Sequence, residues 1–168
     1  MDVFVTATNT LQLDDAYWAL SKQHSDMLAL RSGLFTNTST LATTLGRLRL
    51  ACWGVSENTC PTGPLLAWVF NPNMPLKWWY SGKSHPLHAH RFIHRKSFPI
   101  LRLHVGTLLP FSLALADLAR LGSDEEFAEV APSLYALGAS KVTAFQHLHR
   151  SRLHIDERRR IRERLVTD

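Results

Sequence analysis

The spacing of apolar residues predicts helices in the first third of the chain. Between residues 14 and 32, apolar side chains recur at steps of three and four and therefore lie on one helical face. Leu41, Leu45, Leu48 and Cys52 repeat this spacing, and the polar run 36–40 in front of them offers several N-caps. We therefore expect a helix pair within about 13–53, with helices at about 14–32 and 39–53.

The same periodicity returns in the last third. Pro110 suits the first position of a helix that Gly122 ends, and Ser123 to Glu126 spells a capping box for the next helix, which Pro132 should end. Another helix should begin near Ser140 and either continue or restart at Asp156. We expect a C-terminal helical unit over about 106–166, whose core contains Leu113, Leu118, Leu121, Phe127, Val130, Leu134 and Phe145.

The middle of the chain lacks a clear period. Its first part is rich in turn-forming Pro and Gly, and the apolar run 65–70 is compatible with either a buried strand or a helical turn. We expect a long irregular segment, rich in Trp, Pro and His, over about 55–104. The predicted fold is thus mostly α, with about five helices in a small bundle and a single domain over 1–168.

Length and composition agree with a globular domain. The chain has 168 residues, of which 45% are hydrophobic, and no run approaches the roughly 18 apolar residues of a membrane span. The first residues lack the basic region of a secretory signal, and Cys52 and Cys60 form neither a CxxC pair nor a disulfide framework. We expect no membrane span, reduced thiols and a cytoplasmic location.

Charge is concentrated in two places. The net charge is +5, yet residues 81–104 alone contain five cationic side chains and no acidic one. Residues 150–168 contain seven arginines and four acidic residues. Clusters of this kind attract phosphate-bearing or acidic partners.

Aromatic rings are interleaved with the cations of the middle segment. The rings are those of Trp78, Trp79 and Tyr80, and the cations are Lys83, Arg91, Arg95 and Lys96. Single-stranded nucleic acid is bound by such a combination, because cations hold phosphates while rings stack on bases. The alternative is that the rings anchor a long loop onto the core. No RNP, KH or zinc-finger signature is present.

The middle segment is also rich in histidine. His85, His88, His90 and His94 have spacings at which imidazoles can meet one metal ion. The segment has no Asp, Glu or Cys to complete a site, and its five cations oppose the binding of another cation. We therefore expect no metal ion and no cofactor, and keep these histidines only as candidate ligands.

Catalytic motifs are absent, since the sequence contains no GxSxG, P-loop or GxGxxG pattern. This favours a non-catalytic role, although catalytic groups can also meet in space. Our first hypothesis is an accessory or adaptor subunit that binds protein partners through the aromatic and basic segment and through the C-terminal helix, with Arg158, Arg159 and Arg162. The alternatives are a single-stranded nucleic-acid-binding module and a histidine-based metal-dependent enzyme.

Overall fold

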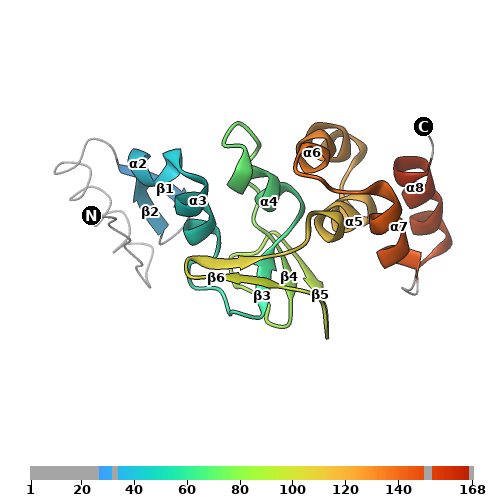
Figure 1. Cartoon of the computed structure of the whole chain (residues 1–168), viewed down its shortest axis with the longest axis horizontal. Coiled ribbons are helices and arrows are strands. Elements are labelled where there is room, and N and C mark those ends of the chain that lie inside the picture. Colours follow the sequence, from blue (N-terminus) through green and yellow to red (C-terminus); the bar gives the residue numbers. More distant parts are fainter. Residues whose placement is uncertain (1–26, 32–33, 150–152, 167–168) are drawn as a thin grey trace. The chain divides into compact units, whose positions relative to one another are not determined.

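The computed structural model of the chain describes residues 27–31, 34–149 and 153–166 (Figure 1). Two compact units divide the chain, residues 1–47 and 48–168. The described residues form seven helices and seven strands in three sheets, so the predicted mostly α bundle of about five helices is wrong. The fold mixes α and β. That residues 1–168 form a single domain stays a prediction, because the division into two compact units does not show whether each unit folds on its own.

The first unit contains a short hairpin followed by a helix. Its elements are β1 (Met27–Arg31), β2 (Leu34–Asn37) and α2 (Thr38–Ala42), and the two strands are antiparallel. The side chain of Asn37 caps α2 by accepting a 2.9 Å hydrogen bond from the Thr40 amide. The end of the predicted helix 14–32 is therefore a strand, because its backbone pairs with β2. Residues 14–26 of that prediction lie outside the described residues.

The predicted helix 39–53 is interrupted. α2 ends at Ala42, and α3 (Thr44–Ala51) begins after Thr43, whose backbone is extended. Thr43 uses its side-chain oxygen to accept a 3.0 Å hydrogen bond from the Gly46 amide, as a residue in front of a helix does. A local side-chain hydrogen bond thus competes with helix continuation.

The second unit contains two small sheets, and all of their strands except the last lie in the segment 55–104 that we predicted to be irregular, which corrects that prediction. In the first sheet, the central strand β4 (Trp79–Gly82) pairs antiparallel with β3 (Thr59–Pro61) and parallel with β5 (Arg91–His94). β6 (Leu101–Leu103) and β7 (Gly106–Leu108) form the second, a hairpin. All four residues of β4 are buried, so both faces of this strand are covered and its sequence does not alternate between apolar and polar residues.

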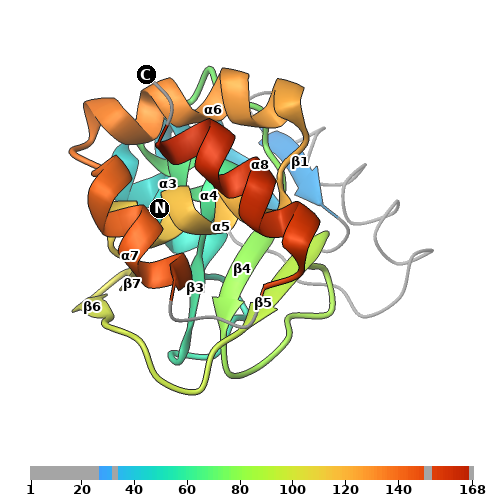
Figure 2. The same ribbon diagram turned by 90° about the vertical axis from the view of Figure 1, so that its right-hand side faces the viewer.

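Five helices complete the second unit: α4 (Gly63–Phe70), α5 (Phe111–Leu121), α6 (Asp124–Ala136), α7 (Lys141–His149) and α8 (Ile155–Leu165). α5 is the central helix and packs against the other four, as Figure 2, with α8 in front, helps to follow. None of the described helices has both the length and the apolar composition that crossing a membrane requires.

The C-terminal helices follow the sequence pattern closely. The predicted capping box is present, since Ser123 Oγ accepts from the Glu126 amide and the Glu126 carboxylate accepts from the Ser123 amide, at 3.1 and 2.9 Å. The predicted stop before Pro132 is wrong, because α6 runs through it to Ala136. Proline removes only one helical hydrogen bond there, and burial of Val130 and Leu134 holds the helix in place.

The main core lies between the first sheet and the helices around α5. Of the residues that we predicted for it, Leu113, Leu118, Val130 and Leu134 are buried, and Leu121, Phe127 and Phe145 pack against it half-buried. Trp79 also belongs to this core and contacts the start of α4. Gly63 has a φ of +50°, and a Cβ on it would lie 2.9 Å from the Trp79 ring, so only glycine fits there.

Candidate anion-binding site

Strand direction brings several polar residues to one edge of the first sheet. The parallel strands β4 and β5 end at the same edge, where the antiparallel strand β3 begins. Two backbone hydrogen bonds close this edge: the Lys83 amide donates to the Asn58 carbonyl at 3.0 Å, and the Arg95 amide donates to the Gly82 carbonyl at 2.8 Å. Lys83 and Lys96, which are 13 positions apart, therefore follow neighbouring strand ends.

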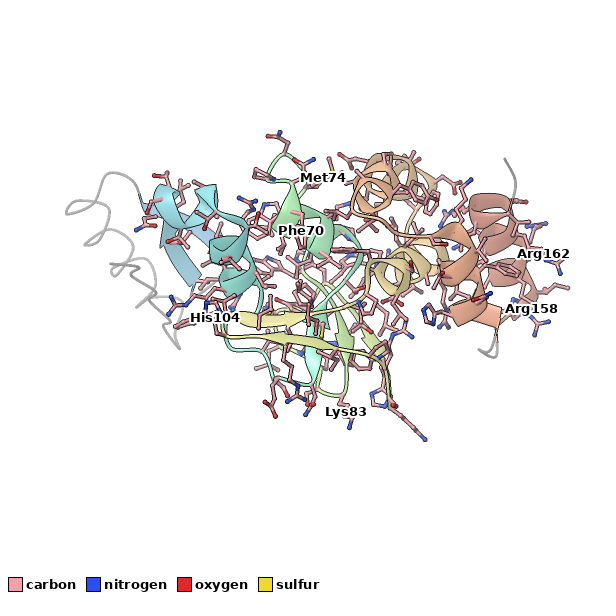
Figure 3. The ribbon with its side chains drawn as sticks, in the orientation of Figure 1. Phe70, Met74, Lys83, His104, Arg158 and Arg162 are labelled. Carbon is pink, nitrogen blue, oxygen red and sulfur yellow. The ribbon has the colours of Figure 1, made fainter. Side chains whose placement is uncertain are left out.

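A hollow of about 300 Å³ lies at this edge. Three cationic residues line it, together with two polar and two apolar ones: Lys83, Lys96, Arg102, Asn58, Ser97, Phe98 and Ile100. In the described part of the chain no carboxylate lines the hollow. Lys83 extends beyond the ends of the strands in Figure 3. Three positive charges around one hollow, with no acidic residue in its described lining, create a local potential that favours an anion.

Arg102 is held beside the hollow by two side chains. Its guanidinium donates to Asn58 Oδ1 at 3.1 Å and forms a 3.3 Å ion pair with Glu57. Both members of the ion pair are more than half exposed, so water screens the pair. The guanidinium has five N–H donors, which leaves it able to bind an anion while it holds Asn58.

A buried polar cluster fixes the end of β5 next to the hollow. Asp117 of α5 is 1% exposed and accepts hydrogen bonds from Arg95 and, at 2.7 Å, from Thr62 Oγ1. Arg95 Nε also donates to Ser81 Oγ at 2.8 Å. Burial raises the pKa of the Asp117 carboxyl, against the opposing effects of Arg95 and Thr62. The cluster joins β4, β5, α4 and α5, and so fixes the backbone from which Lys96 extends.

The aromatic residues predicted to bind a partner are not at the surface. Trp78, Trp79 and Tyr80 are 4%, 1% and 0% exposed, so the expectation that these rings are displayed is wrong. The Tyr80 hydroxyl donates to the Ala51 carbonyl at 2.7 Å, and Trp79 belongs to the core. The physical reason is that β4, the central strand of its sheet, is covered on both faces.

The predicted cations divide into three groups. Lys83 and Lys96 line the hollow, whereas Arg95 is engaged with Asp117, and Arg91 donates to the Leu121 carbonyl and lies 4.8 Å over the Trp79 ring. The third group lies on α8, where the exposed Arg158, Arg159 and Arg162 belong to a different element; Figure 3 shows Arg158 and Arg162 on its outer side.

The four candidate metal ligands are not gathered into one site. His88 Nε2 lies 2.9 Å from the Tyr80 hydroxyl, and His90 Nδ1 accepts from the Trp78 amide at 3.3 Å. His85 and His94 instead each contact the Phe92 ring. Among the described residues no group of three or more His, Cys, Asp or Glu side chains is arranged to hold a metal ion.

Sequence reasoning named only Lys83 and Lys96 of the hollow and missed its other lining residues, among them Asn58 and Arg102. Arg102 was counted with the basic segment, but no motif singles it out, and Asn58 precedes a strand of only three residues. The signal that could have located the hollow was the position of Lys83 and Lys96, each just after a run of residues that favour a strand.

Comparison with known proteins adds no further evidence. No protein-family model, no curated protein and no solved structure matches this chain.

Proposed function

We propose that this chain is a non-catalytic module that binds single-stranded nucleic acid, with the phosphates of the strand at the hollow on the sheet edge. One observation carries the proposal: Lys83, Lys96 and Arg102 line the same hollow, and no carboxylate lines it among the described residues. Contacts between cations and phosphates supply most of the affinity in sequence-independent binding.

The lining also favours a single strand over a duplex. Phe98 and Ile100 lie beside the cations, so the hollow offers apolar contact next to charge. In a single strand the bases are unpaired and their faces are available for such contact, whereas a duplex presents mainly its phosphates to a small basic hollow.

The proposal is tested by removing charge at the hollow. The affinity of the full chain for a fluorescently labelled single-stranded oligonucleotide is measured by anisotropy, for the wild type and for Lys83→Gln combined with Lys96→Gln. Both lysines are exposed, so the double variant should fold normally. We expect its affinity to fall at least about tenfold at low salt, since two phosphate contacts are lost.

The matched control removes the same charge from the other basic surface. Arg158→Gln combined with Arg159→Gln changes two exposed arginines of α8, and we expect a much smaller loss of affinity. If the α8 variant lost its affinity for the oligonucleotide and the hollow variant kept it, the binding site would lie on α8 and not at the hollow. A wild-type chain that binds no single strand at low salt would remove the proposal.

An accessory role with a protein partner stays a second proposal, supported by the exposed arginines 158, 159 and 162 on α8. Arginine is favoured at protein interfaces. Co-purification of a partner from native extract should then be lost when these three residues are changed together. We also propose a cytoplasmic location, which the sequence alone supports.

A further inference from the structure

Three rings pack in succession, with Phe92 in contact with both His85 and His94. The ring centroids of His85 and Phe92 are 4.8 Å apart, and those of Phe92 and His94 are 6.5 Å apart, with the planes tilted by 56° and 57°. Both histidines are exposed, and Phe92 between them is half-buried. Phe92 therefore supports two rings that water reaches. We call these three residues the ring row.

The ring row lies on the sheet face opposite the buried Ile93. Phe92 and His94 are two positions apart on β5 and share one face, whereas the intervening Ile93 points to the other. The residue of β4 that pairs with His94 is Gly82, which has no side chain to cover the imidazole. β5 is also the outer strand of its sheet among the described residues.

The two lysines of the hollow flank the ring row along the chain. His85 follows Lys83 by two residues, and His94 precedes Lys96 by two. Both lysines line the hollow. Rings of this kind beside phosphate-binding cations are the two components of sequence-tolerant single-strand recognition, and histidine is among the residues on which unstacked bases stack.

We propose that His85 and His94 stack on bases of a single strand, with Phe92 holding both imidazoles in position. This inference rests on the proposed function, because it takes the phosphates of the same strand to lie at the hollow. The ring row, and not the buried Trp78 and Trp79, then supplies the contact with bases that the sequence led us to expect.

The test compares two probes with the same number of phosphates. One is a labelled oligothymidylate of about ten nucleotides, within the site sizes of single-strand binders, and the other is its abasic counterpart. We expect the wild type to bind the intact strand about tenfold more tightly, which corresponds to the lower part of the stacking range. His85→Ala combined with His94→Ala should remove most of this preference.

Two variants control for indirect effects. His94→Tyr keeps a ring at the exposed position and should retain most of the preference for the intact strand. His104→Ala removes an exposed histidine from the turn between β6 and β7 and should leave the preference unchanged.

The outcomes separate this inference from the proposed function. Equal binding of intact and abasic strands by the wild type overturns the inference and leaves phosphate binding standing. Full preference for the intact strand in the double histidine variant also overturns it. Binding of neither probe overturns both.

Discussion

At the scale of single residues, the most constrained group is the carboxyl of Asp117. It is nearly inaccessible to water, and it is stabilised there by Arg95 and Thr62. A buried charge without its partner is expensive, whereas the intact pair contributes little net stability. Asp117 therefore serves to hold four elements in one arrangement near the hollow.

Replacement of Asp117 by Asn should be strongly destabilising. The amide keeps the shape and can still accept from Thr62, but it removes the negative charge that Arg95 faces, so the free energy of unfolding should fall by about 3 kcal/mol. Urea unfolding measures this loss. Asp124→Asn is the control, because Asp124 pairs with Arg164 at an exposed position and should cost far less. Equal losses in the two variants would contradict a structural role for the buried cluster.

The Cys60 thiol should make the free energy of unfolding depend on pH in the alkaline range. Burial raises its pKa from 9.0 to about 11, partly offset by Thr107. Since the unfolded chain then loses this proton first, the free energy of unfolding should fall as pH rises from about 9 to about 11. Between pH 8 and pH 10, urea unfolding of the wild type should show an extra loss of about 1.4 kcal/mol relative to Cys60→Ala. An identical pH dependence in the two proteins would contradict the raised pKa.

At the scale of elements, α8 shows how a very polar helix can be part of the fold. Ile161 and Leu165 are its buried contacts, at 1% and 3% exposed. Arg164 donates to the carbonyls of Ala119 and Gly122 at the end of α5, both at 2.9 Å, and Glu157 pairs with Arg120. A partner is therefore not needed to hold this helix in place.

The buried side of α8 can be tested by truncation. Ile161→Ala removes a side chain from the core and should lower the free energy of unfolding by about 3 kcal/mol. Ile155→Ala changes a residue of the same type and helix that is 75% exposed, and it should have almost no effect. Thermal or urea unfolding distinguishes the two. A negligible loss at Ile161 would show that α8 contributes no packing.

The sequence predicted correctly those elements in which the helical spacing of apolar residues repeats over several turns. α5 to α8 contain 9 to 13 residues each, with caps and an apolar stripe, and their positions followed from the pattern except for the stop at Pro132. The strands contain only three to five residues, too few to establish an alternation. Within the candidate site, charge counting located Lys83 and Lys96, whereas the burial of Trp78 and Trp79 depends on pairing between distant strands.

At the scale of the whole molecule, the charge of +5 is distributed over surfaces with different uses. Some of the positive side chains stabilise the fold, since Arg91, Arg95 and Arg164 donate hydrogen bonds to other parts of the chain. The remainder includes the three cations of the hollow and the outer side of α8. Net charge alone therefore does not give the number of phosphates that the chain can neutralise at one surface.

The most direct measurement of the central claim is the salt dependence of single-strand binding. If three cations of the hollow each neutralise one phosphate, the slope of log K against log salt concentration should be about −2 for the wild type. In the variant with Lys83→Gln and Lys96→Gln it should fall to about −0.7. A slope near zero in the wild type, or the same slope in both proteins, would contradict the assignment of phosphate binding to this hollow.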